Sequence, residues 1–150
     1  MSVIETVESA IVAQLQTVAT LAPNAGGTVR GVADIKTFYD LTTLEPPSAI
    51  VVFDGEKAKP DQTIGKATQQ TEMFWSIYLV ASSFGTNSEG RSAVYQMLDD
   101  VVLALEGFPI VVPDVIATKI TYVGTARYHV GDTVVIYESR WRHQFLRQEA

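Results

Sequence analysis

The sequence predicts an α+β fold in which two amphipathic helices cover a mostly antiparallel, mixed sheet of about five strands. Three observations support this prediction. Two segments have the apolar spacing of a helix, several short stretches are rich in β-branched and aromatic residues, and Gly or Pro stands at most boundaries. The expected order is α-β-β-β-α-β-β, with most neighbouring strands close enough in sequence to pair antiparallel. At 150 residues, the chain is expected to form a single domain over residues 1–150.

The first helix is predicted at the start of the chain. Ser2 and Glu5 have the spacing of a capping box, in which each side chain satisfies a backbone N–H at the helix start. Apolar residues then recur at steps of three and four, which places them on one face: Ile4, Val7, Ile11, Leu15 and Val18. The helix is expected to end before the breaker run Pro23–Gly27.

Three strands are expected between the helices. Thr28–Tyr39 alternates loosely, and Ser48–Phe53 is apolar on both faces, as in a central strand. Thr71–Ser82 alternates more regularly, and one of its faces carries Met73, Trp75, Ile77 and Leu79. The other face carries Phe74 and Tyr78 among polar residues. Residues 55–70 are predicted to form a long polar loop, a kind of segment that is usually functional or disordered.

The second helix is predicted from another capping box, formed by Thr86 and Glu89. Its apolar face is expected to contain Val94, Met97, Leu98, Val101, Val102 and Leu105. Gly107 stands where a left-handed helix stop needs a glycine. Trp75 and Met73 are expected to pack against the apolar faces of both helices.

Two more strands are expected after the second helix, at Val115–Val123 and Thr133–Phe145. Between them, Gly124–Gly131 is predicted to be a hairpin loop that contains His129. The basic residues near the end are Arg140, Arg142, His143 and Arg147. They are expected to form the solvated end of the last strand.

Composition restricts the function. Seventeen acidic and eleven basic residues give a net charge of −6, and the basic residues form no extended stripe, so specific nucleic-acid binding is not expected. The chain has no cysteine, which excludes disulfides and thiolate metal sites. Its longest apolar run, Val101–Leu105, is far shorter than the roughly 20 residues of a membrane span. We expect no membrane partner and no secretory leader, and a protein made in the cytosol.

No residue set predicts a reaction centre. Neither His129 nor His143 lies in a catalytic or zinc-binding motif, and the glycines near residue 27 lack the pattern of a phosphate-binding loop. Asp99 and Asp100 are adjacent acids, but the side chains of neighbouring residues on a helix point about 100° apart. The two carboxylates therefore cannot easily hold one metal ion or act together on one substrate. We therefore expect no enzyme activity, no cofactor and no bound metal.

A candidate subunit interface is indicated by apolar residues at positions that are expected to face solvent. Leu103 falls on the polar side of the second helix, and with Phe74, Tyr78 and Leu41 it forms a modest surplus of such groups. The charged residues of the polar loop are added to this candidate interface: Lys57, Lys59, Asp61 and Lys66. An exposed leucine is also common on ordinary surfaces, so the same residues are compatible with no interface at all.

Taken in order, several segments resemble the Mu-type tail protein family, which has tail-terminator roles in contractile-tailed phages and prophages. The segments are Ile4–Ile11, Pro47–Phe53, Phe74–Val80, Ala93–Val101 and Val135–Trp141. The resemblance covers nearly the whole chain, but its motifs are amphipathic patterns that many α+β domains share. The loop at 55–70 matches no motif of the family.

The resemblance implies an α+β subunit that forms a six-membered ring on the finished tail tube and offers the surface where the head docks. It implies copies of the same chain, the tail tube, the sheath and a head-completion or neck protein as partners. It also implies a place in the virion tail, assembled in the bacterial cytoplasm, and no catalytic residues. Two alternatives remain: another head–tail or tail-tube component, or a small cytosolic ligand-binding domain or enzyme.

Overall fold

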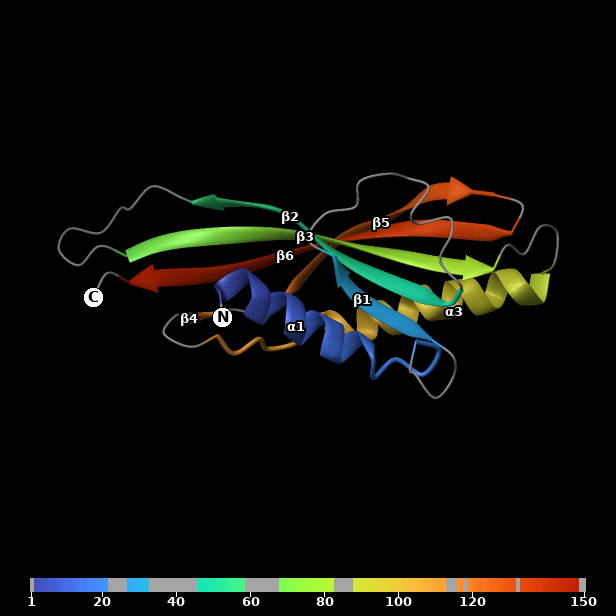
Figure 1. Cartoon of the computed structure of the whole chain (residues 1–150), viewed down its shortest axis with the longest axis horizontal. Helices are drawn as coiled ribbons and strands as arrows, with labels where there is room; N and C mark the ends of the chain where they lie inside the picture. The colour runs from blue at the N-terminus through green and yellow to red at the C-terminus, as the bar shows by residue number, and fades with distance from the viewer. Residues whose placement is uncertain are drawn as a thin grey trace.

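The computed structural model describes residues 2–21, 27–32, 46–58, 68–82, 88–112, 116–117, 119–131 and 133–148. Within them, helices α1 (Val3–Leu15) and α3 (Ser88–Leu105) lie on the same face of one sheet (Figure 1). The strands are β1 (Thr28–Val32), β2 (Ser48–Ala58), β3 (Thr68–Ser82), β4 (Ile116–Ala117), β5 (Thr121–Val130) and β6 (Val134–Gln148). The predicted α+β class is confirmed.

The sheet is mixed and mostly antiparallel, as predicted. Its order is β1-β2-β3-β6-β4, with β5 also paired to β6. Only β1 and β2 run parallel among the described pairs. β6 pairs with β3 along its whole length, so its other edge holds β5 over Val135–Arg142 and β4 over Phe145–Leu146. β6 therefore joins the two halves of the sheet.

Helix α1 begins as the sequence predicts. The Glu5 N–H donates to Ser2 Oγ at 3.1 Å, and the Ser2 N–H donates to Glu5 Oε2 at 3.0 Å, which completes the capping box. The helix ends at Leu15, and hydrogen-bonded turns continue the chain to Leu21. Gln14 Nε2 donates to the Ala104 carbonyl at 2.8 Å, which ties α1 to the end of α3.

One hydrophobic core fills the space between the helices and the sheet. It includes the predicted helix positions Val7, Ile11, Leu15, Val18, Val94, Met97, Val101 and Leu105. From the sheet it includes Met73, Trp75, Ile77, Leu79, Tyr137, Trp141 and Phe145. The expectation that Met73 and Trp75 pack under both helices is confirmed, because both are fully buried in this core. Gly107 has φ 73°, so its predicted role as a left-handed helix stop is also confirmed.

Two predicted loops are wrong in part. Gly55–Ala58 belongs to β2, and residues 68–70 belong to β3, so the strands continue into the predicted loop 55–70. Residues 59–67 lie outside the described part of the chain. Gly124–Val130, the greater part of the predicted hairpin loop, belongs to β5, which pairs with β6 as far as Val130 and Val135. The strand predicted at Val115–Val123 is two separate strands, β4 and β5, and the position of Val115 is not described.

Other predicted boundaries fall partly outside the described residues. β1 ends at Val32 in the described structure, and residues 33–39 of the predicted strand are not described. Thr86, the predicted cap of the second helix, also lies outside the described residues. None of the described helices is long and apolar enough to cross a membrane.

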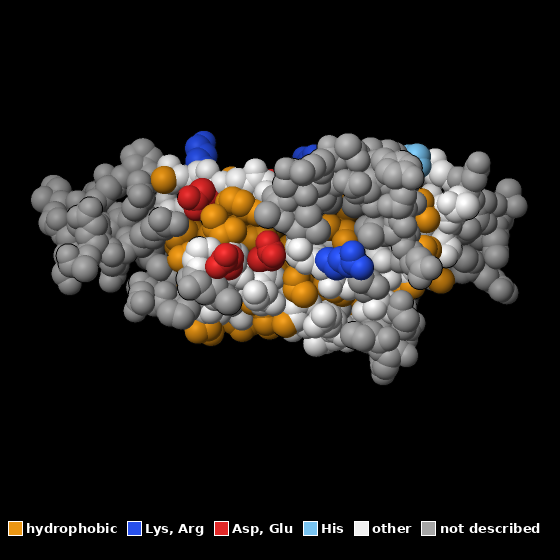
Figure 2. Space-filling model, viewed as in Figure 1, with side chains coloured by type: hydrophobic (Ala, Val, Ile, Leu, Met, Phe, Trp, Pro, Cys, Tyr) orange, Lys and Arg blue, Asp and Glu red, His pale blue; other side chains and the backbone are white. Residues whose placement is uncertain are grey.

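Some apolar side chains remain at the surface. Figure 2 shows hydrophobic side chains along the lower edge of the molecule, where Figure 1 places the segment that follows α3. Val111 in this segment is 85% exposed, and Leu103 on α3 is 78% exposed. The prediction that Leu103 lies on the outer side of its helix is confirmed.

Candidate functional site

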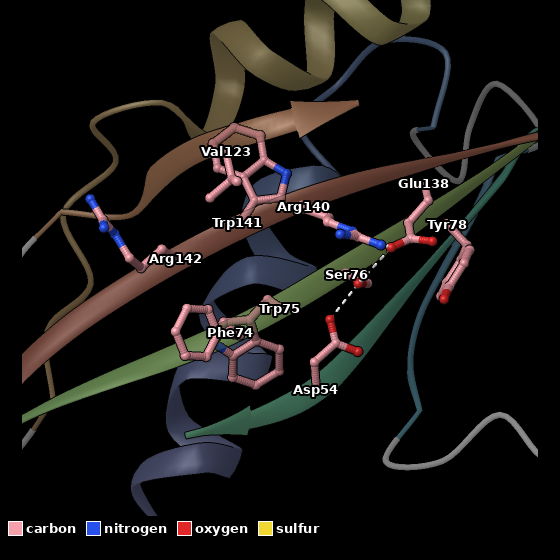
Figure 3. Close-up of a pocket in the computed structure, with 10 residues that line it drawn as sticks. All are labelled: Asp54, Phe74, Trp75, Ser76, Tyr78, Val123, Glu138, Arg140, Trp141 and Arg142. Atoms are coloured by element: carbon pink, nitrogen blue, oxygen red, sulfur yellow. Dashed lines mark hydrogen bonds and ion pairs between the residues drawn. The ribbon is translucent and has the colours of Figure 1, made fainter. Parts of the chain in front are cut away.

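A hollow of about 560 Å³ lies on the distal face of the sheet, defined here as the face that points away from α1 and α3. Alternate residues of β3 and β6 point toward this face, because side chains alternate along a strand. Figure 3 shows the residues that line the hollow. They are Asp54, Phe74, Trp75, Ser76, Tyr78, Val123, Glu138, Arg140, Trp141 and Arg142.

Three β-bulges shape the distal face. The pairing of β2 with β3 skips Asp54, and the pairing of β5 with β6 skips Val123 and Tyr128. Each skipped residue has no partner of its own on the neighbouring strand. A bulge of this kind bends the strand and can redirect a side chain. Asp54 and Val123 line the hollow, and the Tyr128 ring packs edge-on against Tyr78 at 5.1 Å between centroids. All three bulged residues therefore contribute to one surface.

The bulge in β2 depends on a glycine. Gly55 follows Asp54 and has φ 142°, a region that side-chain-bearing residues rarely adopt. A Cβ at Gly55 would meet no atom within 4 Å, so the backbone conformation and not crowding requires the glycine. The sequence Asp54-Gly55 thus sets the direction of the Asp54 carboxylate.

A polar network occupies one end of the hollow. The Ser76 hydroxyl donates to Asp54 Oδ2, and Glu138 Oε1 lies 3.4 Å from the same hydroxyl. Arg140 Nε donates to Glu138 Oε1 at 2.6 Å in an ion pair. A hydroxyl has one proton, so Ser76 cannot satisfy both carboxylates at once. Figure 3 shows the four side chains converging from β2, β3 and β6.

The electrostatics of this end are negative. Burial raises the pKa of the Tyr78 phenol to about 12, and the charges of Glu138 and Asp54 add to the shift while Arg140 opposes it. Tyr78 also packs against a small apolar cluster of the distal face, formed by Ile50, Val80, Val134 and Ile136. The hydrogen bond to Glu138 is the main cause that raises the pKa of the Arg140 guanidinium, and this group stays charged at any physiological pH.

The other end of the hollow is basic. Arg142 lies opposite Phe74 in the register of β3 and β6, and Figure 3 shows its guanidinium pointing away from the polar network. Its Nε is buried and has no hydrogen-bond partner within the described part of the chain. The hollow thus presents negative groups at one end and a cation at the other.

The structure brings together only some of the predicted interface residues. Phe74 and Tyr78 line the hollow, and Lys57 lies on the same face because it pairs in register with Glu72. Leu103 is on α3, on the other side of the sheet. The remaining predicted residues, Leu41, Lys59, Asp61 and Lys66, lie outside the described residues.

Sequence reasoning missed the polar residues of the site, Asp54, Ser76, Glu138 and Arg140. The alternation of Thr71–Ser82 already placed Ser76 on the face of Phe74 and Tyr78. The same alternation in β6 would have added Glu138, Arg140 and Arg142. Asp54 was missed because it lies one residue beyond the predicted strand Ser48–Phe53, although it continues the alternation of Ile50 and Val52.

The predicted basic cluster is divided by the sheet. Arg140 and Arg142 point to the distal face, whereas His143 is fully buried on the helix side and stacks on Phe145 at 6.4 Å between centroids. The expectation that His143 belongs to a solvated strand end is therefore wrong, since neighbouring strand residues point to opposite faces. His129 lies on β5 and not in a loop.

The hollow combines aromatic side chains with charged groups. Among the described residues, no group of three or more His, Cys, Asp or Glu side chains could hold a metal ion. Asp99 is exposed on α3, and Asp100 accepts a hydrogen bond from Gln96 Nε2 at 2.9 Å one turn earlier. What the hollow offers is aromatic surface, a serine between two carboxylates and a guanidinium at each end of the lining.

The fold belongs to a class that is found in virions. The chain is similar in structure to a chain described as "Virion of native gene transfer agent (GTA) particle", with a TM-score of 0.55. The two share 15% sequence identity, and the match covers 99% of this chain and 98% of the other. At this identity, the likeness establishes the shared fold. None of the curated proteins compared with the chain matches it.

The family is defined by a second comparison. Residues 7–150 match the family described as "Phage tail terminator protein". The chain therefore belongs to the phage tail terminator family, as its resemblance to tail-terminator proteins predicts. It is a structural phage tail protein, and its place is in the virion tail.

Proposed function

We propose that this protein is the terminator of its tail: six copies form a ring that caps the completed tail tube and offers the surface on which the head docks. The observation that carries the proposal is the family match over residues 7–150, which includes most of α1 and all later described elements. In this function the protein acts through its surfaces and catalyses no reaction. Its partners are other copies of the chain, the tail tube and sheath, and a head-completion or neck protein.

Ring formation needs two different surfaces on each subunit. Copies around a six-fold axis meet head to tail, whereas a two-fold contact uses one surface twice and closes at a dimer. Among the described residues, large apolar groups are exposed in several places, and two of these places suit this requirement. Leu103 lies on α3, and Val123 and Tyr128 lie on β5 beside the hollow. The two places lie on different sides of the sheet, as a head-to-tail contact requires.

A terminator ring must let DNA pass without holding it. Binding to the phosphate backbone needs clustered Lys and Arg that release counterions from the duplex. The chain has a net charge of −6, and its Arg140 is already paired with Glu138. These charges favour a ring that is tolerant of DNA and not adhesive to it.

Assembly state tests the proposal directly. The protein should form six-fold rings, seen by electron microscopy or light scattering, at high concentration or on purified tail tubes. On tubes, the rings should stand at one end, whereas a tube component would be incorporated along the length. A duplex titration at physiological salt should show no affinity tighter than about 1 µM. A two-fold dimer under all conditions, or tighter duplex binding, would contradict the proposal.

A further inference from the structure

We propose that the hollow on the distal face is the seat of a neighbouring copy of this chain and holds a Lys or Arg side chain of that copy against Asp54. The inference rests on the proposed ring and names the surface by which one copy engages the next. It follows from three features of the described residues: the bulges that build the hollow, the excess negative charge at one end of it, and the irregular sheet edge beside it.

The hollow is built at a cost to regular pairing. Each bulge at Asp54, Val123 and Tyr128 interrupts a ladder of hydrogen bonds, and Gly55 takes a backbone conformation reserved for glycine. Bulges concentrate where a side chain must be redirected. Here all three extra residues lie on one surface, on the side of the sheet opposite the core.

The polar end of the hollow has one negative charge in excess. Asp54 and Glu138 both meet the Ser76 hydroxyl, and of the described cations only Arg140 reaches this group, through Glu138. Burial is the main cause of the raised pKa of Tyr78, and the negative charges of Glu138 and Asp54 add to it. A cation placed here donates a charge-assisted hydrogen bond to Asp54 and contacts an aromatic wall.

The sheet edge beside the hollow favours contact through side chains. A regular edge strand can extend its sheet with a strand of another molecule, and bulges are one device that prevents this. β5 lies at the edge of the described sheet and has two bulges in ten residues. Strand addition at β5 is therefore disfavoured, and the adjoining hollow is the surface left for a neighbour.

A second copy can supply the required cation. Arg91 is exposed on α3, which lies on the opposite face of the sheet and so cannot reach the hollow of its own chain. The same helix exposes Leu103. One subunit thus offers acidic and aromatic groups on its distal face, and an exposed arginine and an exposed leucine on α3, which also carries Asp99 and Asp100. This complementarity between different surfaces is what a head-to-tail contact needs.

The test compares charge reversals of two acidic residues. Asp54→Lys should raise the protein concentration at half-assembly of rings by about tenfold or more, because it opposes the incoming cation. Glu56→Lys makes the same charge change at an exposed position of β2 that is neither in the hollow nor on α3, and it should leave assembly within about twofold. Both variants should keep the far-UV spectrum and melting temperature of the parent chain at concentrations where it is a monomer.

A third variant guards against a folding defect. Asp54→Asn keeps the shape of the side chain and an oxygen that can accept from Ser76, but it removes the charge. It should weaken assembly less than Asp54→Lys and make assembly less sensitive to salt, since the ion pair with the neighbour is screened by ions.

The outcomes separate this inference from the proposed function. If the parent chain forms rings and Asp54→Lys forms them equally well, or Glu56→Lys weakens them as much, the hollow is not the seat and the terminator function stands. If Asp54→Lys forms normal rings that no longer bind tubes, the hollow contacts the tube and the inference is overturned. If the parent chain forms no ring even on tubes, both proposals fail.

Discussion

Trp75 and Trp141 form a natural comparison from which the cost of one missing hydrogen bond can be predicted. Both are fully buried, and they lie opposite each other in the register of β3 and β6. Each packs on one aromatic neighbour at nearly the same distance: Trp75 on Phe53 at 5.2 Å and Trp141 on Tyr122 at 5.0 Å between centroids. They differ at the indole nitrogen. Trp141 Nε1 donates to Ser139 Oγ at 2.8 Å, whereas Trp75 Nε1 has no partner in the described part of the chain.

The difference can be turned into free energies. Replacing either tryptophan by phenylalanine removes a similar volume from the core, at about 1–2 kcal/mol. Trp141→Phe also removes the indole donor from the Ser139 hydroxyl, which keeps only the longer contact from Thr125 Oγ1 at 3.4 Å, and this adds about 1–3 kcal/mol. Trp75→Phe instead removes a buried N–H that has no acceptor, which offsets part of its cost. We expect Trp141→Phe to lower the free energy of unfolding by at least about 1 kcal/mol more than Trp75→Phe. Trp75→Ala should cost about 3–5 kcal/mol.

Urea unfolding followed by circular dichroism gives the two free energies, with equal m-values as the check that the unfolded states are comparable. For a chain of this size, about 1 kcal/mol corresponds to a difference in melting temperature of about 2–4 °C. The chain has two tryptophans, so each variant keeps one as a fluorescent probe of the core. If Trp75→Phe costs as much as Trp141→Phe, the buried N–H of Trp75 carries no penalty and the reasoning is refuted.

Two further predictions concern backbone crowding and pH. Gly27→Ala should lower the free energy of unfolding by about 1–3 kcal/mol in thermal denaturation, because a Cβ there would lie 2.3 Å from the Leu21 carbonyl carbon. Gly124→Ala is the matched control and should be close to neutral, since a Cβ there meets nothing within 4 Å. Because the pKa of Tyr78 is raised to about 12 in the folded state, the unfolded chain loses this proton first as pH rises from 10 to 12. Stability should fall over that interval more steeply in the parent chain than in Tyr78→Phe, and equal slopes in urea unfolding would contradict it.

The helices and the helix side of the sheet were predictable because their periodicities are uninterrupted. Val7, Ile11 and Leu15 repeat at helical spacing and are buried together, and Met73 and Trp75 repeat at strand spacing and lie in the same core. In these segments no bulge or break shifts the periodicity, so the spacing of the apolar residues alone predicts which side chains are buried.

The strand ends and the hollow were not predictable for a physical reason. The two bulges of β5 shift the alternation of its side chains twice within ten residues, so the segment does not read as a strand. The end of β2 contains Glu56 and Lys57, which are polar because they are exposed, although their backbone pairs with β3. Asp54 and Glu138 are brought together only through the registers of β2, β3 and β6, which one sequence does not specify.

The position of β6 in the sheet has a consequence for when the subunit becomes competent to assemble. β6 is the last described strand along the chain, yet β3, β4 and β5 all pair with it. During synthesis, the earlier strands therefore emerge before their common partner exists. The Glu138–Arg140 pair of the hollow is itself carried on β6. A nascent chain thus lacks this surface until its last strand has been made, so the contact that we propose at the hollow forms only after each subunit has folded.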